Sequence, residues 1–387
     1  MIYTLAIANY RSLREVVLPL TQLTVITGAN GSGKSNLYRA LRLLSDTAIG
    51  SAIPSLAREG GINSAVWAGP ESFAKGVKEG RLPVQGGPRQ KPVNIKLGFA
   101  SDKFSYSVEF GLPTPPQVAF AHDPEIKREA IWHGEKWRPA SALVDRHGPL
   151  VHVHNDNGAW QTMSEKLAPY DSMLTQLADP TSAPEVLVLK GTICSWRFYD
   201  RFRTDEFAPA RQTQIGTRTP VLDHDGRDLA AALQTIIEIG DAGTLASAIE
   251  DAFPGAEMWI EFDQGQFQVA FKQYGLLRPL SSAELSDGTL RYLLWVAALL
   301  TPRPPALMVL NEPETSLHPD LVPPLARLIQ KVSQSSQVWV VTHSTTLSQQ
   351  LTKIDHSQLV CLEKVLGETQ VRGQDPLDKL VWNWPTR

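Results

Sequence analysis

A glycine-rich stretch near the start of the chain has the residue types and spacing of a phosphate-binding loop. Residues 28–35 read Gly-Ala-Asn-Gly-Ser-Gly-Lys-Ser and match the pattern G-x-x-x-x-G-K-[ST] at every fixed position. Backbone N–H groups of small residues can close around phosphate oxygens, a lysine can reach the β and γ phosphates, and a serine hydroxyl can bind Mg²⁺. The pattern predicts a nucleotide and metal site formed by Asn30, Gly31, Ser32, Gly33, Lys34, Ser35 and Asn36.

The segments on either side of this loop favour the same interpretation. Leu23–Thr27 is a β-branched run typical of a strand, and Asn36–Leu44 has apolar residues at helical spacing. A strand, a glycine loop and a helix N-terminus in this order are the context that a phosphate loop requires, because the positive end of the helix favours an anion.

Four further motifs follow downstream in a fixed order. They are a helix opening at Leu285–Thr289, a hydrophobic strand at Ala306–Pro313 that contains Glu312 near its end, and the short stretches Ser316–His318 and Val338–His343. Taken alone, each has an ordinary structural reading, since Ser-Asp-Gly is a common N-cap and a Thr-His after a strand is usually a loop histidine. Their joint order after a phosphate loop indicates one composite site.

The order and spacing of these motifs resemble the head domain of the ATP-binding-cassette (ABC) superfamily. Leu285–Thr289 is similar to the signature loop of that superfamily, Asn311-Glu312 to the end of its Walker B strand, and His343 to its switch histidine. The phrase Glu312–Pro319 resembles RecF-like and OLD-like ATPases. The chain is therefore identified as a RecF-like or SMC-like ATPase of AAA_21 type, and a transporter motor is disfavoured.

This resemblance implies a reaction and the residues that carry it. ATP and Mg²⁺ would bind at the phosphate loop, with Lys34 as one catalytic residue. Glu312 would orient and deprotonate the attacking water, and His343 would touch the γ phosphate. The expected enzyme is an ATPase.

The resemblance also implies an assembly. In the family the signature loop acts in trans, so Ser286, Asp287 and Gly288 of one copy would contact the nucleotide that Lys34 of a second copy holds. The expected state is an ATP-dependent homodimer that hydrolysis releases.

Three positions depart from the family or extend it. Asn311 stands where the family usually has Asp, so we expect it to meet Mg²⁺ beside Ser35 as a poorer ligand, and either hydrolysis is slow or the site works through water at near normal speed. His318 replaces the usual switch carboxylate. Arg58 lies in a stretch that resembles the SMC-head segment whose arginine reaches nucleotide or DNA, although a solvated loop cation is the alternative.

The glutamine that senses the γ phosphate in the family has no clear counterpart. Gln85, Gln90 and Gln117 are the candidates, and all three lie in stretches without a readable pattern.

The pattern along the chain predicts an α/β fold with a mixed or parallel core sheet, an antiparallel β layer and a helical second lobe. The resemblance implies that this fold is a P-loop NTPase head of ABC type. We expect residues 1–160 to hold the phosphate loop and the antiparallel layer, 161–255 to form the helical lobe, and 256–387 to complete the head. Residues 50–92 are rich in glycine and predict a loop with little regular structure.

Composition excludes some classes of protein. Hydrophobic residues make up 42% and charged residues 20%, and no run of about 18 apolar residues exists, so no membrane partner is expected. Two cysteines and the absence of a secretion signal at the N-terminus suit a reducing cytoplasm. The net charge of -3 leaves nucleic acid binding open.

Two further sequence features suggest a function, but we favour a structural explanation for each. Trp196–Asp205 interleaves aromatic residues with arginines, as a nucleic-acid surface could, but its acidic residues, Asp200 among them, nearly cancel that charge; an amphipathic segment packed in the second lobe is preferred. Five histidines between His122 and His154 lack the fixed spacing of a closed metal site.

Two hypotheses of function remain. The first is a cytoplasmic RecF-like ATPase that dimerises on ATP and acts on DNA in repair or genome maintenance, where the DNA part rests on analogy of fold. The second is a nucleotide-gated switch that binds an unknown protein partner, in a defence or toxin-control system, with no nucleic acid of its own.

Overall fold

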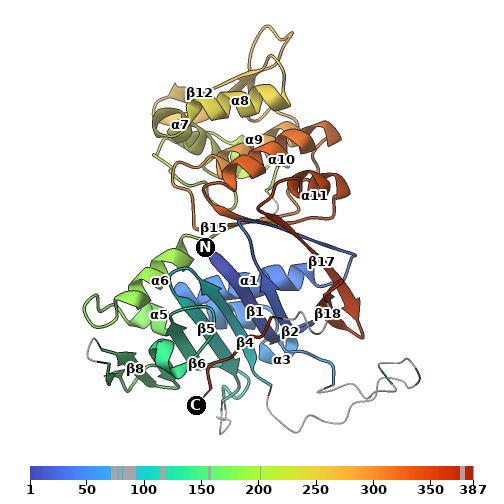
Figure 1. The fold of residues 1–387 in the computed structure, drawn as a ribbon. Coiled ribbons are helices and arrows are strands. Elements are labelled where there is room, and N and C mark those ends of the chain that lie inside the picture. Colours follow the sequence, from blue (N-terminus) through green and yellow to red (C-terminus); the bar gives the residue numbers. More distant parts are fainter. Residues whose placement is uncertain are drawn as a thin grey trace. The chain divides into compact units, whose positions relative to one another are not determined.

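The computed structural model divides the chain into two compact units (Figure 1). It describes residues 1–70, 77, 81, 93–113, 119–155, 158–200, 202–374 and 380–386. Unit 1 comprises residues 1–21, 28–196 and 360–387, and unit 2 comprises residues 22–27 and 197–359. The chain therefore crosses between the units four times, twice around a single strand near its start.

Unit 1 is built on an antiparallel sheet of eight strands, in the order β2-β1-β4-β5-β6-β7-β8-β9. The strands are β1 (Ile2–Tyr10), β2 (Leu13–Pro19), β4 (Ile95–Ser101), β5 (Ser105–Gly111), β6 (Glu125–Trp132), β7 (Ala142–His147), β8 (Leu150–His154) and β9 (Trp160–Ser164). The alternating pattern of 93–160 predicts this layer, and the structure adds the first two strands of the chain to it.

Helix α1 (Lys34–Ala48) packs on this sheet against β1 and β4, directly after the phosphate loop (Figure 1). Its apolar residues fall on one face, and Leu37, Leu41 and Leu44 are buried there. Among the described residues, the shorter helices of this unit are α2 (Ala52–Arg58), α3 (Ile62–Ala65), α5 (Met173–Gln176) and α6 (Pro184–Cys194). The prediction of an irregular loop from residue 50 onward is therefore wrong for α2 and α3.

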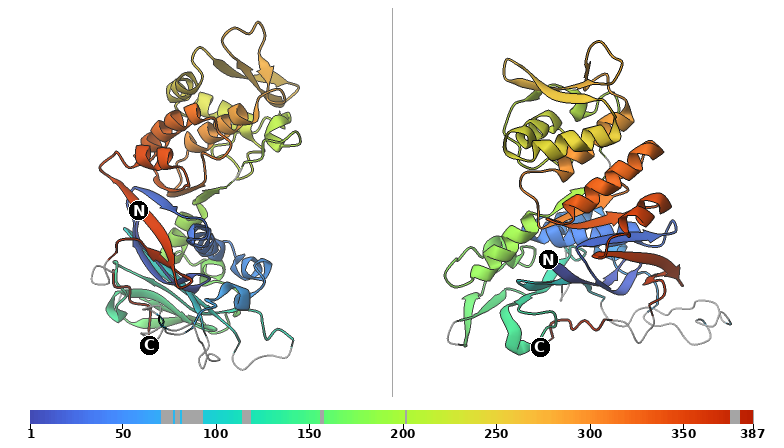
Figure 2. Two further views of the ribbon diagram at one scale, coloured as in Figure 1. Left: turned by 90° about the vertical axis from the view of Figure 1, so that its right-hand side faces the viewer. Right: turned by 45° about the horizontal axis from the view of Figure 1, so that its top comes forward.

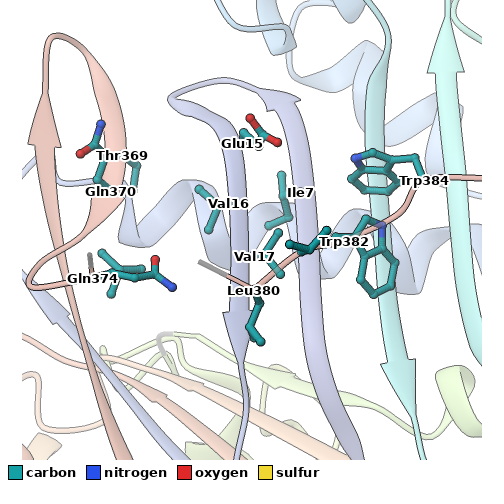
Figure 3. Close-up of a pocket in the computed structure, with 12 residues that line it drawn as sticks. Ile7, Glu15, Val16, Val17, Thr369, Gln370, Gln374, Leu380, Trp382 and Trp384 are labelled. Atoms are coloured by element: carbon teal, nitrogen blue, oxygen red, sulfur yellow. The ribbon is translucent and has the colours of Figure 1, made fainter. Parts of the chain in front are cut away.

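The C-terminal residues cover the other face of the same sheet. Trp382 packs edge-on against Trp132 at a ring separation of 5.6 Å and lies beside Gly98, which points away from the face that carries Leu97 and Phe99. Trp382 and Trp384 line a cavity of about 290 Å³ together with Ile7 of β1 and with Val16 and Val17 of β2 (Figure 3). Strand β18 (Glu368–Val371), paired antiparallel with β17 (Ser357–Val365), borders this cavity through Thr369.

Unit 2 contains a parallel sheet in the order β10-β15-β16-β3. Its strands are β10 (Arg197–Tyr199), β15 (Leu307–Asn311), β16 (Gln337–Val341) and β3 (Leu23–Gly28). Their residues are almost continuously apolar and buried, as expected for strands covered on both faces. The segment Trp196–Asp205 thus supplies a strand of this sheet, whereas the sequence favoured an amphipathic segment.

Five helices and a small sheet complete unit 2 (Figures 1 and 2). The helices are α7 (Leu229–Ile239), α8 (Ala242–Ala252), α9 (Asp287–Leu299), α10 (Val322–Val332) and α11 (Thr345–Leu351). The small sheet contains β11 (Gln214–Ile215), β12 (Glu257–Asp263), β13 (Gln266–Lys272) and β14 (Leu280–Ser281). Helix α9 is buried from Thr289 to Leu299 and lies at the centre of the core.

The architecture confirms the predicted fold class, with a parallel core sheet, an antiparallel layer and a helical part. The domain boundaries predicted at residues 160 and 255 are based on helix and strand content, whereas the two units are defined by contacts between residues. These boundaries stay a prediction. Among the described residues, no helix is both long and apolar enough to cross a bilayer.

Candidate functional site

The phosphate loop lies in unit 1 between the end of β3 and the first residue of α1. Lys34 is almost fully buried, and its Nζ donates hydrogen bonds to the carbonyl oxygens of Gly28, at 2.6 Å, and Ala29, at 3.0 Å. The ammonium group therefore lies inside the curve of the loop. Asn30, Gly31 and Ser35 are exposed, so backbone and hydroxyl groups of the loop are open to a ligand.

Two glycines of the loop are required by their surroundings. Gly33 has a φ of +110°, and a Cβ at this position would lie 2.0 Å from Oγ1 of Thr369. Gly28 has a φ of +150°, and its Cβ would lie 2.3 Å from the carbonyl oxygen of Leu362. Any side chain at either position meets both backbone strain and a clash.

A chain of hydrogen bonds connects the phosphate loop to Ser12 and to Thr369 of β18. Asn36 Nδ2 donates to Ser12 Oγ at 2.8 Å, Ser12 Oγ lies 2.7 Å from Thr369 Oγ1, and Thr369 Oγ1 donates to the carbonyl oxygen of Ser32 at 2.8 Å. Ser12, Thr369 and Ser32 are buried, so these bonds form away from water and polarise one another. The Ser32 hydroxyl itself is buried and has no hydrogen-bond partner within the described part of the chain.

We expect Thr369→Val to weaken ATP binding by about 3- to 10-fold, because valine keeps the shape of threonine but leaves the Ser32 carbonyl and the Ser12 hydroxyl without their partner. Equilibrium titration with a fluorescent ATP analogue measures the change. Thr369→Ser keeps the hydroxyl and is the matched control. Equal affinities of the two variants would contradict a role of this hydroxyl in shaping the loop.

The register of the parallel strands in unit 2 shows which strand ends lie together. Tyr199 of β10 aligns with Leu310 of β15, Asn311 aligns with Val341 of β16, and Val341 aligns with Ile26 of β3. The carboxyl ends of these four strands therefore lie at one edge of the sheet. Ligands of open α/β sheets bind at such an edge.

Glu312 and His343 meet at this edge. Oε1 of Glu312 lies 3.2 Å from Nε2 of His343, and both side chains are about 40% exposed. Glu312 has a positive φ of +50°, which is uncommon for glutamate, and its N–H donates to the carbonyl oxygen of Val341 at 2.7 Å. Strained backbone of this kind persists only where the surrounding structure maintains it, and such residues cluster at functional sites.

A second glutamate, which the sequence analysis did not single out, holds the loop that carries His343. Oε1 of Glu314 accepts hydrogen bonds from the hydroxyl of Thr342 and from the N–H groups of His343 and Ser344, the latter two at 3.1 Å. Three donors fix the direction of this carboxylate. Glu314 thus connects the segment after β15 to the segment after β16.

Asn311 has a carboxylate partner from the neighbouring strand. Its Nδ2 donates to Oδ1 of Asp200 at 3.1 Å. Asp200 follows the last residue of β10, level with Asn311 in the parallel register. The sequence analysis gave Asp200 no role beyond cancelling the charge of nearby arginines.

The signature-like loop precedes α9, and Ser286 is the N-cap of that helix. Its hydroxyl accepts a hydrogen bond from the N–H of Thr289 at 3.2 Å, so the ordinary N-cap reading is correct as a structural description. Ser286 and Asp287 are exposed, whereas Leu285 is buried. The positive end of a 13-residue helix is therefore open to an anion at this loop.

Arg211 anchors this loop. Its guanidinium donates to the carbonyl oxygens of Thr204, Asp205, Ser282, Ala283 and Leu285, and to the carboxylate of Asp287 at 2.7 Å. Its side chain is only 9% exposed, so these bonds are largely shielded from water. Nearby, the hydrogen bond from Arg278 lowers the pKa of Glu284 to about 2, which keeps that surface pair ionised.

We expect Arg211→Met to lower the free energy of unfolding by about 3 kcal/mol, since methionine has a similar length but leaves several buried carbonyl groups unpaired. Urea denaturation measures this loss. Arg203→Met is the matched control in the same segment, because Arg203 is exposed and forms a surface ion pair with Asp205. It should change the free energy of unfolding far less than Arg211→Met, since surface ion pairs contribute little. Similar losses for both variants would exclude an anchoring role.

The remaining predicted positions are Arg58, His318 and three glutamines. Arg58 ends α2 in unit 1, is exposed and donates to Ser55 Oγ at 2.9 Å. His318 is exposed and caps the short helix η3 (Pro319–Leu321) beside Asp320. Gln85, Gln90 and Gln117 lie outside the described residues.

The residues expected to bind nucleotide are divided between the units: those of the phosphate loop and Arg58 belong to unit 1, and those of residues 286–288, 311, 312 and 343 to unit 2. Within the described ranges, no group of three histidine, cysteine, aspartate or glutamate side chains forms a metal cluster.

Comparison with known proteins identifies the family. Residues 23–348 match the family AAA_21, described as "AAA domain, putative AbiEii toxin, Type IV TA system". The chain belongs to the AAA_21 family. The resemblance to RecF-like and SMC-like P-loop ATPases, stated from the motifs, is thereby confirmed. No match was found among curated protein sequences.

Solved structures similar to this AAA_21 chain include SMC heads. The head in "Crystal structure of the SmcHead bound to the C-winged helix domain of ScpA" aligns with a TM-score of 0.51 and 14% sequence identity, over 96% of this chain and 97% of that one. The SMC head domain from Thermotoga maritima aligns with a TM-score of 0.48, 14% identity and the same coverage. At this identity the first likeness establishes the fold alone.

Proposed function

We propose that this AAA_21 protein binds ATP with Mg²⁺ at the phosphate loop, hydrolyses it, and pairs with a second copy of itself while ATP is bound. The observation that carries the proposal is the pairing of Glu312 with His343 at the carboxyl edge of a parallel sheet whose strand β3 continues into the phosphate loop. Phosphoryl transfer needs this combination of phosphate cradle, water activation and charge neutralisation.

Several loop features support the binding of a triphosphate. The Lys34 ammonium lies inside the loop, and the buried Ser32 hydroxyl lacks a partner among the described residues. At Gly31 no atom of the described residues lies within 4 Å of the Cβ position, so a phosphate can approach the backbone closely there. Ser35 and Asn311 offer the oxygen ligands that Mg²⁺ prefers, and the metal would neutralise phosphate charge and orient the γ phosphate.

Glu312 and His343 divide the catalytic work. Glu312 acts as the general base, because its carboxylate is half-exposed and can accept the proton of an attacking water. His343, whose Nε2 lies 3.2 Å from the same carboxylate, contacts the γ phosphate, while Glu314 fixes its backbone. Loss of the γ phosphate would free His343 and so report hydrolysis to its loop.

The exposed signature-like loop supports assembly of two copies. Ser286 and Asp287 face solvent at a helix N-terminus, and Gly288 adds no side chain, so the loop offers N–H groups to a phosphate held by another copy. We propose that ATP joins two heads in this way and that hydrolysis separates them.

For the partner of the assembled heads we propose DNA, with the protein acting in repair or genome maintenance in the cytoplasm. The support is analogy with the SMC-head fold. The alternative, a nucleotide-gated switch that binds a protein, is favoured by the family description, which names a toxin of a type IV toxin–antitoxin system.

Size-exclusion chromatography of Glu312→Gln with and without MgATP tests the central proposal. Blocking hydrolysis should trap the ATP-bound pair, so we expect a dimer only with MgATP. Adding Ser286→Arg, which places a bulky side chain in the exposed loop, should return the protein to a monomer that still binds ATP. A single-copy species at saturating ATP would rule out assembly on nucleotide.

A DNA-binding assay distinguishes between the two proposed partners, DNA and a protein. If DNA is the partner, the trapped protein should bind duplex DNA with an affinity that falls steeply with salt. No binding at about 50 mM salt, with or without ATP, favours the protein-binding switch.

A further inference from the structure

We propose that Asp200 supplies the carboxylate that acts on the nucleotide-bound Mg²⁺, directly or through one of its waters, in place of the carboxylate absent at Asn311. The inference rests on the proposed function, because it assumes that MgATP binds at this edge. It concerns a residue to which neither the motifs nor the family match assigns a role.

The position of Asp200 is fixed by the sheet. Residues Arg197–Tyr199 pair in parallel register with Met308–Leu310, so Asp200 and Asn311 are the next residues of adjacent strands. Both side chains are half-buried, and the hydrogen bond of 3.1 Å between them joins the two strand ends. Asp200 therefore stands at the level of the Walker B position, one strand away.

The direction of that hydrogen bond explains the choice of asparagine. The Asn311 amide donates with Nδ2 to Asp200 Oδ1, so the carboxylate of Asp200 and the Oδ1 of Asn311 both present acceptor oxygens at this edge. An aspartate at position 311 would instead place two carboxylates in contact, and two like charges at this distance repel. The pair Asn311 and Asp200 carries one negative charge, as a single Walker B aspartate does.

Mg²⁺ needs few protein ligands of this kind. It keeps several waters when it binds a nucleotide and takes one or two protein oxygens in addition. A carboxylate oriented by an amide donor is suited to bind a ligand of the metal, such as a water, and so to tune metal affinity. Loss of such a carboxylate typically weakens metal binding by about 10- to 100-fold.

The test is the gain in nucleotide affinity that Mg²⁺ provides. Binding of a fluorescent ADP analogue is titrated in EDTA and in saturating Mg²⁺ for wild type, Asp200→Asn, the exchanged double variant Asp200→Asn with Asn311→Asp, and the exposed control Asp263→Asn. We expect Asp200→Asn to reduce the gain in nucleotide affinity from Mg²⁺ by about 10- to 100-fold. In EDTA the variant should bind the nucleotide no more weakly than wild type, because a carboxylate without metal repels phosphate. The exchanged variant should recover most of the gain.

A purely structural role predicts another result. If Asp200 only held Asn311 or its strand, Asp200→Asn would weaken binding equally in EDTA and in Mg²⁺, and the exchange would not restore the gain; either result overturns the inference. A wild type that binds no nucleotide in any condition overturns the proposed function, and this inference with it.

The single variant Asn311→Asp gives a second measurement that does not depend on Asp200→Asn folding. Two adjacent carboxylates should lower the melting temperature in EDTA, and Mg²⁺ with ADP should restore it more than in wild type. Equal metal responses of the two proteins contradict a shared metal site.

Discussion

Replacement of Glu312 by glutamine is expected to reduce the turnover of ATP by about 10²- to 10⁴-fold, the usual contribution of a positioned general base. Glutamine keeps the size of the side chain that lies 3.2 Å from His343 Nε2, but it cannot take a proton from water. Release of phosphate at saturating MgATP measures the rate. Binding of ATP should change little, because the affected proton moves only during the reaction.

The control for this experiment is Glu261→Gln, an equivalent change at an exposed position of β12. It should keep the wild-type rate. If Glu312→Gln also kept that rate, another residue would have to activate the water, and the catalytic assignment of this edge would be wrong.

Replacement of Gly33 by alanine is the second large effect that we expect. The new methyl group would meet the Thr369 hydroxyl at 2.0 Å, and the φ of +110° is unfavourable for any residue with a Cβ. Strain of about 1–2 kcal/mol and overpacking of about 1–3 kcal/mol both act on the loop. The variant should lose at least about tenfold in affinity for ATP, measured by equilibrium titration, and its melting temperature should fall.

Gly31→Ala is the matched control, because Gly31 also has a positive φ, of +79°, but no atom of the described residues lies within 4 Å of its Cβ position. It should show the strain without the clash. Combining Gly33→Ala with Thr369→Ala removes the atoms that crowd the methyl group most and should restore part of the lost stability. Failure of this rescue would show that backbone strain alone decides the effect.

The sequence predicted the elements whose signals are local. Strands β15 and β16 are short buried runs followed by polar residues, a pattern that is visible in the sequence. The phosphate loop is recognisable because its function needs fixed residues at fixed spacing. Glu312 and His343 were found through the order of the motifs, and the structure brings the two side chains together.

The residues that the sequence did not reveal act through partners far along the chain. Asp200 meets Asn311, and Thr369 supports Ser32 from the last hairpin of unit 1, so no window of sequence contains both members of either pair. Glu314 lies beside Glu312 in the sequence, but its role depends on the segment after β16. Such pairs require the topology of the sheets before they can be recognised.

Helices α2 and α3 were missed for a different reason. The glycines at positions 60 and 61 were read as part of a long loop, whereas in the structure they separate two short helices whose residues Leu56 and Ile62 are buried. Turn residues mark where a helix ends as well as where structure is lacking, and composition alone does not distinguish these cases.

The early crossing of β3 between the units constrains how the nascent chain can fold. β3 leaves the ribosome long before its partner β16, which is synthesised roughly 300 residues later. The parallel sheet of unit 2 therefore cannot be completed until most of the protein has been made. A truncated protein that starts at residue 197 would expose the edge of β16 to aggregation. Expression of unit 2 alone would therefore need residues 22–27 reattached, and the intact protein is expected to depend on chaperones during its synthesis.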